Sequence, residues 1–138
     1  MEIKDKVVVV TGGASGIGAG LAQRFASEGA QGVVVADLDA QGAQRVADAI
    51  GPQALALRCD VSCAADIQQL VQQARQRFGR IDIYFSNAGI PPGSRGIDEP
   101  DETWERMWRV HTMAHVWAAR AVLPDMVERG EGYFLLTS

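Results

Sequence analysis

The sequence predicts an α/β protein built on a doubly wound parallel sheet. Apolar runs typical of buried strands alternate with amphipathic helical stretches along all 138 residues. A glycine-rich turn lies between the first strand and the first helix, and an aspartate ends the second strand. The length fits one domain, since a domain averages about 150 residues.

Five strands are expected. Val7–Val10 is a continuous β-branched run, as expected for a strand covered on both faces. The other four are predicted at residues 33–37, 54–57, 81–85 and 133–137. Each pair is separated by a helical stretch, and such crossovers make neighbouring strands parallel.

Three helices are predicted from apolar residues at helical spacing. The first carries Ile17, Leu21 and Phe25 and ends at Gly29, and the second runs from Ala43 to Ile50. The third spans Ile67 to Phe78, with Ser62 as its expected N-cap.

A longer, fourth helix is predicted after a proline-rich loop at residues 90–100. Pro100 and the two acids after it favour a helix start, while Pro124 and Gly130 mark the expected end. This helix is apolar nearly all round, so we expect it to be buried.

The charge pattern excludes several partners. The net charge is −4, so a basic footprint for nucleic acid or an anionic membrane surface is absent. The N-terminus lacks the apolar core of a secretory signal, and no apolar run approaches a membrane span. Cys59 and Cys63 make a poor zinc site and are expected to be reduced thiols, with no bound metal. We therefore expect a cytoplasmic protein without a nucleic-acid or membrane partner.

The glycine-rich turn predicts a pyrophosphate site. Gly12, Gly16 and Gly18 form a G-x3-G-x-G pattern directly after a buried strand and at the start of a helix. Glycines there allow a tight turn, close approach of an anion to the backbone, and close packing of helix on strand. A purely structural loop is the alternative, which the flanking strand and helix disfavour.

Asp37 predicts the choice of cofactor. It ends the second strand, 19 residues after Gly18, where an acid can accept hydrogen bonds from the adenosine ribose. Its charge would repel a 2′-phosphate, and no Lys or Arg nearby would pair with one, so NAD is expected rather than NADP. The alternative is that Asp37 or Asp39 only caps the next helix.

Two further motifs follow the glycine turn and Asp37 along the chain. Asp60-Val61 follows the third strand, and Asn87-Ala88-Gly89 follows the fourth. With the glycine turn, these make the chain resemble the N-terminal part of a short-chain dehydrogenase/reductase. That family has a Rossmann-like sheet of seven strands, so residues 1–138 would form the dinucleotide-binding domain with its first five strands.

The resemblance implies a set of cofactor-binding residues. The pyrophosphate would lie on the glycine turn, the adenosine ribose on Asp37, the adenine beside Asp60 and Val61, and the nicotinamide ribose above residues 87–89. Val110 belongs to the family's Val-Asn motif and is placed with this group. The full set is Gly12, Ser15, Gly16, Ile17, Gly18, Asp37, Asp60, Val61, Asn87, Ala88, Gly89 and Val110.

Two positions depart from the family pattern. Ser86 replaces the first Asn before Asn87, and His111 replaces the Asn that holds a water in the family's proton relay. An imidazole can also donate and accept, so His111 is the candidate catalytic residue of this chain. The alternatives are packing on the helix face with Trp104 and Trp108, and a metal pair with His115, which lacks a third ligand.

The implied activity is NAD-dependent hydride transfer between an alcohol carbon and a carbonyl of a small-molecule substrate, by a homo-oligomer when full length. The family's catalytic Tyr-x-x-x-Lys is missing, because Ala88 follows Tyr84 and Thr137 follows Tyr133 at that spacing. Ser138 falls one residue before the usual catalytic serine. We therefore expect the 138-residue chain to be truncated before the catalytic segment and inactive alone. A catalytically silent nucleotide-binding module acting through a partner chain is the alternative, and a methyltransferase is disfavoured by the motifs.

Overall fold

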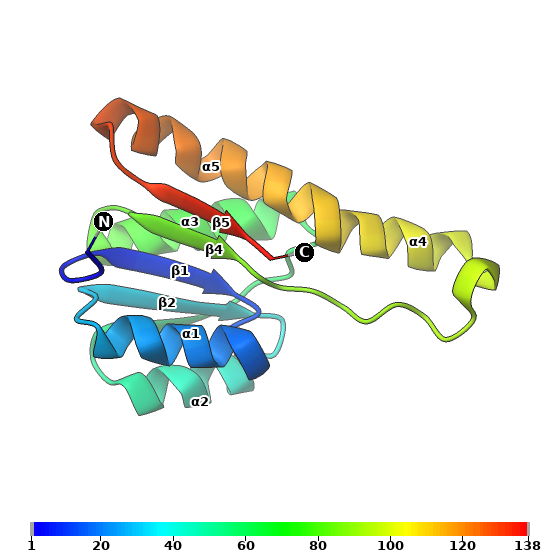
Figure 1. The fold of residues 1–138 in the computed structure, drawn as a ribbon, viewed down its shortest axis with the longest axis horizontal. Helices are drawn as coiled ribbons and strands as arrows, with labels where there is room; N and C mark the ends of the chain where they lie inside the picture. The colour runs from blue at the N-terminus through cyan, green and yellow to red at the C-terminus, as the bar shows by residue number, and fades with distance from the viewer. Residues whose placement is uncertain (1, 138) are drawn as a thin grey trace.

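The described residues form one sheet of five parallel strands in the order β3-β2-β1-β4-β5 (Figure 1). The computed structural model describes residues 2–137, so the expectation for Ser138 lies outside the described residues. The strands are β1 Val7–Thr11, β2 Gly32–Asp37, β3 Ala54–Arg58, β4 Ile83–Ser86 and β5 Tyr133–Leu136. The predicted doubly wound, Rossmann-like fold is confirmed.

Helices cover both faces of the sheet. Those described are α1 Gly16–Ser27, α2 Ala40–Ile50, α3 Ala64–Phe78, α4 Asp101–Trp108 and α5 Ala114–Arg129, with a 3₁₀ turn at Gly96–Asp98 and a π-helical turn at Arg109–Met113. In Figure 1, α1 and α2 lie on one face, and α3 and α5 lie on the other. This placement leaves the end of the sheet that is formed by the carboxyl ends of the strands uncovered by these helices.

The two-sided burial explains the apolar strands. Val8 and Val10 pack with residues of α1 and α2, whereas Val9 packs with residues of α3 and α5. Side chains alternate between the faces of a sheet, so a strand covered on both sides requires apolar residues at every position. Val7 to Val10 are fully buried, which confirms the expectation for this run.

The fourth helix differs from its expected burial. None of the residues of α4 is buried, and Trp104 and Trp108 are 49% and 60% exposed. Figure 1 shows the reason: α4 extends past the sheet, whereas α5 lies along it. An apolar pattern alone does not say which part of a long helix has a sheet beneath it.

The expected helix end at Gly130 is confirmed, but Pro124 as a mark of that end and Ser62 as an N-cap are both wrong. Helix α5 continues through Pro124 and ends before Gly130, whose φ of 69° is left-handed. Proline removes only its own N–H, so the helix loses one hydrogen bond here and keeps the rest. Ser62 does not cap α3: Cys63 precedes that helix, and the Ser62 hydroxyl donates to Asp60 Oδ1 at 2.6 Å.

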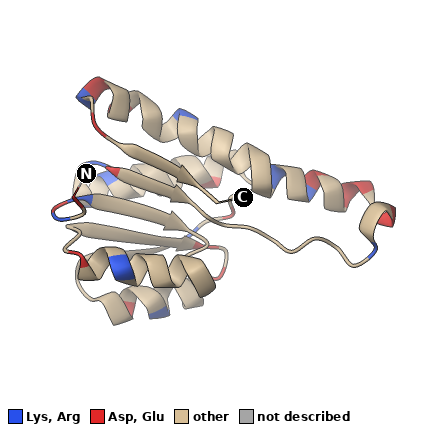
Figure 2. Ribbon diagram, in the orientation of Figure 1, with Lys and Arg blue, Asp and Glu red and all other residues tan. Residues whose placement is uncertain are grey.

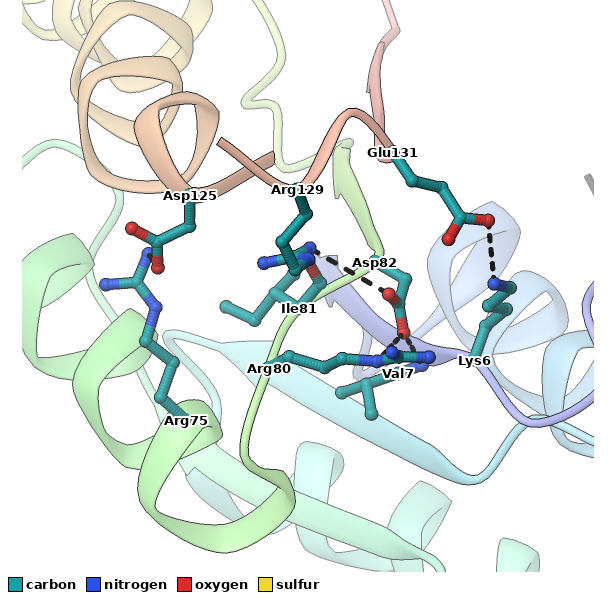
Figure 3. Close-up of polar contacts among 9 residues, drawn as sticks. All are labelled: Lys6, Val7, Arg75, Arg80, Ile81, Asp82, Asp125, Arg129 and Glu131. Atoms are coloured by element: carbon teal, nitrogen blue, oxygen red, sulfur yellow. Dashed lines mark hydrogen bonds and ion pairs between the residues drawn. The ribbon is translucent and has the colours of Figure 1, made fainter. Parts of the chain in front are cut away.

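A buried carboxylate, Asp82, lies where β1 and β4 begin (Figure 3). Asp82 is 1% exposed, and its Oδ2 accepts from the Val7 N–H at 2.9 Å and from Arg80 Nε at 3.1 Å. Arg129, at the end of α5, donates to the Ile81 carbonyl at 2.7 Å and lies 3.9 Å from Asp82 Oδ1. These contacts join β1, the chain before β4, and α5.

Charged residues lie on the helices and loops, while the strands are almost free of them (Figure 2). This distribution matches a sheet that is buried on both faces. Within residues 2–137, no helix combines the length and the apolar character that crossing a membrane requires.

Candidate cofactor site

The glycine turn between β1 and α1 is folded as tightly as its spacing predicts. Gly12 has a φ of 67°, and a Cβ there would lie 2.8 Å from the Ala88 Cα. A Cβ on Gly18 would overlap the carbonyl oxygen of Gly12. Both positions therefore require glycine, since they bring the turn, the helix start and the end of β4 into direct contact.

The outer side of the same turn is open. A Cβ on Gly16 would meet nothing within 4 Å, and Ser15, Gly16 and Ile17 are all exposed. The first N–H groups of a helix have no partner within the helix, and the Ser15 side chain makes no capping bond to them. Open space in front of these N–H groups fits an anionic pyrophosphate.

Asp37 links the end of β2 to the glycine turn. Its Oδ2 accepts from the Ala14 N–H at 3.0 Å, and its Oδ1 accepts from the Asp39 N–H at 3.0 Å. Asp39 is the residue that caps α2, through the Gly42 N–H at 3.0 Å. Each carboxylate oxygen of Asp37 retains a lone pair, so the group can accept further hydrogen bonds.

Asp60 follows β3 and is fixed by its own loop. Its Oδ1 accepts from the Ser62 hydroxyl at 2.6 Å and from the Ser62 N–H at 2.9 Å. Hydrogen bonding from Ser62 lowers the pKa of Asp60, and the charges of Arg106 and Arg58 lower it further. The carboxylate is therefore ionised at neutral pH and available as an acceptor.

The neighbouring Cys59 has a buried and unreactive thiol. The residue is 2% exposed, and burial followed by the nearby charges of Asp66 and Asp60 raises the pKa of its thiol to about 12. The thiol stays protonated at neutral pH, so it packs as a small apolar group and is a poor nucleophile.

Thr11 holds the turn after β4 against β1. Its hydroxyl oxygen accepts from the Asn87 N–H at 3.0 Å and from the Ala88 N–H at 3.2 Å. The Asn87 Nδ2 donates to the Thr11 carbonyl at 3.1 Å. The backbone and the side chain of Asn87 thus both bond to Thr11. These bonds fix the turn that carries Ala88 and Gly89 against β1.

One hollow collects residues from the ends of several strands. Its lining is Gly12, Asp37, Leu38, Cys59, Asp60, Val61, Ala88, Gly89, Ile90, Arg106 and Val110. Seven of these belong to the predicted set. Ser15, Gly16, Ile17, Gly18 and Asn87 lie outside this lining, on the adjoining glycine turn and behind the turn after β4.

Four lining residues were missed by sequence reasoning: Leu38, Cys59, Ile90 and Arg106. Three of them are sequence neighbours of predicted residues. Arg106 lies four residues before Val110, and this spacing puts two residues on the same helix face, so it could have been found.

His111 contacts the turn after β4. Its Nε2 lies 2.9 Å from the Ile90 carbonyl oxygen and 3.3 Å from the Ile90 nitrogen. The residue belongs to the π-helical turn, and its ring packs against Gly89, where an added Cβ would come within 3.1 Å of Cε1. The structure thus gives His111 a backbone partner at the turn beside the hollow.

His115 has a separate partner. Its Nδ1 lies 2.7 Å from the hydroxyl oxygen of Ser86, which is 3% exposed at the end of β4. Burial, and then the charge of His111, lowers the pKa of His115 below its usual value. Across residues 2–137, no His, Cys, Asp and Glu side chains gather in a group of three that could hold a metal.

Solved structures share this architecture. A short-chain dehydrogenase/reductase from Burkholderia phymatum, in complex with NAD, is 30% identical with a TM-score of 0.94, covering 100% of this chain and 50% of that one. A 3-ketoacyl-(acyl-carrier-protein) reductase from Brucella melitensis, complexed with NADH, is 37% identical with a TM-score of 0.88, covering 97% and 57%.

Sequence relatives point the same way. Galactitol 2-dehydrogenase of Agrobacterium fabrum is 40% identical over 96% of this chain and 51% of that protein. The 1-deoxy-11-beta-hydroxypentalenate dehydrogenase of Streptomyces exfoliatus is 38% identical over 99% and 51%. The chain thus spans about half the length of these relatives. The family model described as short chain dehydrogenase matches residues 6–138, and the chain therefore belongs to the short-chain dehydrogenase family.

Proposed function

We propose that this chain is the NAD-binding part of an oxidoreductase that transfers a hydride between an alcohol carbon or carbonyl and nicotinamide. The observation that carries the proposal is the hollow at the carboxyl ends of the strands, with the open glycine turn beside it. The two solved structures named above are complexes with NAD and NADH, which supports a nicotinamide cofactor.

The residues of this chain would bind and orient the cofactor. Bound NAD supplies the hydride acceptor, and the protein supplies orientation and electrostatics. The glycine turn at Gly16 offers N–H groups and space to the pyrophosphate, while Asp60 accepts from the adenine amino group. His111 would take the place of the family's relay asparagine beside Ile90, holding or passing a proton at Nε2.

The choice of NAD over NADP rests on Asp37. Its carboxylate is fixed by two backbone N–H groups and keeps lone pairs for the ribose hydroxyls. The same negative charge would repel a 2′-phosphate. Among residues 2–137, Arg106 is the one arginine or lysine that lines the hollow, and two carboxylates, Asp37 and Asp60, line it with the opposite charge.

The test is kcat/KM of the full-length protein with NAD and with NADP. We expect a preference for NAD, and we expect Asp37→Ala to reduce it, because both the acceptor and the repulsive charge are removed. Asp48→Ala is the matched control, since Asp48 is an exposed acid of α2 outside the hollow. A preference of the natural protein for NADP would overturn the assignment of the cofactor.

The second candidate is a catalytically silent nucleotide-binding module that acts through a partner chain. It is favoured by one observation: the hollow and the open glycine turn are features of nucleotide binding, which a silent module would share with an enzyme. A Tyr-x-x-x-Lys in the coding sequence beyond Ser138 would favour the enzyme, whereas NADH binding without turnover by the full-length protein would favour the module.

A further inference from the structure

Arg106 forms part of the wall of the cofactor hollow. The residue lies on α4, one helical turn before Val110, and lines the hollow with Asp60, Val61 and Leu38. It also lines a second hollow, beside Ile90 and Glu102. Arg106 therefore borders two hollows, the cofactor hollow and the hollow beside Ile90.

The guanidinium of Arg106 has no fixed partner among residues 2–137. Arg75 and Arg80 of the same chain form ion pairs with Asp125 and Asp82, but the Arg106 side chain is exposed and forms neither an ion pair nor a hydrogen bond in this part of the chain. Its positive charge nevertheless acts on a group of the hollow, because it helps to lower the pKa of the Asp60 carboxyl. An unpaired guanidinium can contact a ligand without first breaking a bond to the protein.

The surroundings of Arg106 suit a flat, neutral ligand group better than a phosphate. The hollow holds two carboxylates, Asp37 and Asp60, and an apolar Leu38 that is 48% exposed. A phosphate would meet the repulsion of both carboxylates. A purine base carries no net charge, and a planar guanidinium stacks on such rings.

We propose that Arg106 is a specificity-determining residue of this site, and that its guanidinium plane lies against the adenine base of the cofactor. The inference rests on the proposed nicotinamide-cofactor site. It assigns the adenine end of that site a wall from α4, in addition to the walls contributed by the ends of β2 and β3.

The test compares two fragments of the cofactor, one with and one without the adenine, on the full-length protein. ADP-ribose contains the adenine, and reduced nicotinamide mononucleotide does not, so we expect Arg106→Gln to weaken binding of ADP-ribose about three- to tenfold. Binding of the mononucleotide is expected to be unchanged. Isothermal titration calorimetry with each compound measures both dissociation constants.

Arg120→Gln is the matched control, because Arg120 is an exposed arginine of α5 that lines neither hollow. Equal affinity of the wild-type protein and Arg106→Gln for ADP-ribose would overturn the inference, as would an equal loss for both compounds. A loss confined to 2′-phospho-ADP-ribose would also overturn it, since it would assign Arg106 to the 2′-phosphate. Failure of the wild-type protein to bind ADP-ribose would instead refute the proposed function.

Discussion

The His111 ring supports the turn after β4, beside the cofactor site. Its Nε2 meets both backbone polar groups of Ile90, and its carbon edge packs on Gly89. A neutral ring can donate to the carbonyl or accept from the N–H according to its tautomer. The contact lies beside the hollow, at the turn that follows Asn87, so the ring can influence turnover without forming part of the hollow's lining.

Replacement of His111 should therefore separate a proton function from packing. We expect His111→Asn in the full-length protein to keep or raise turnover, because an amide can both donate and accept at this position. His111→Ala should lower kcat with little change in NAD affinity. Equal kcat values for the natural protein and both variants would leave His111 with a packing role only.

The strand, turn and helix at the start of the chain act as one element whose glycines are not equivalent. Gly18 and Gly20 both lie in α1, yet a Cβ on Gly18 would overlap the Gly12 carbonyl, while one on Gly20 would meet nothing within 4 Å. We expect Gly18→Ala to destabilise the protein by about 1–3 kcal/mol, as overpacking does, and to weaken NADH binding. Gly20→Ala should be neutral or stabilising by up to about 1 kcal/mol. Urea denaturation of both variants of the full-length protein measures the difference, and equal free energies of unfolding would contradict it.

The contact between His115 of α5 and Ser86 of β4 predicts that the stability of the protein depends on pH. Folding lowers the pKa of His115, so the unfolded chain binds this proton more readily than the folded chain. Stability from this group is present above its unfolded pKa of about 6.5 and is lost as the pH falls below it. The free energy of unfolding of the full-length protein should thus fall as the pH is lowered from about 7.5 to about 5.5, and it should fall less in His115→Gln. Glu131, whose pKa is also lowered, does not interfere, because carboxyls titrate at lower pH. The same slope in both proteins would contradict the prediction.

The elements show what a sequence can and cannot specify. The valines of β1 and β2 were predictable because a strand buried on both faces leaves no choice of residue. Pro124 was misleading, since a helix held on a sheet tolerates the loss of one hydrogen bond, and Ser62 was misleading because its hydroxyl serves Asp60 instead. Arg106 lies four residues before Val110, so the helical spacing places it on the face of Val110, but that it lines the site follows only from how α4 lies relative to β3.

At the scale of the whole molecule, the apolar surface of residues 2–137 is unevenly covered. The strand β5 lies at one edge of the described sheet, where Tyr133, Leu135 and Leu136 are 47%, 37% and 55% exposed. Phe134 stacks on Tyr84 with ring centroids 5.6 Å apart, so this strand is held from one side. Trp104 and Trp108 add further exposed apolar area on α4.

These exposures predict how residues 1–138 behave when they are produced by themselves. An unpaired strand edge invites pairing with other chains, and exposed apolar side chains promote association. Full burial of a large apolar side chain contributes about 1.5–3 kcal/mol, so losing part of it at five positions is significant against a total stability of about 5–15 kcal/mol. We expect this chain alone to aggregate or to unfold without cooperativity, and to produce no NADH from alcohols, because it lacks the Tyr-x-x-x-Lys pair. Size-exclusion chromatography with light scattering, urea denaturation and NADH absorbance measure the three properties. A stable monomer that unfolds cooperatively would contradict the structural expectation, and alcohol-dependent NADH formation by that monomer would contradict the catalytic one.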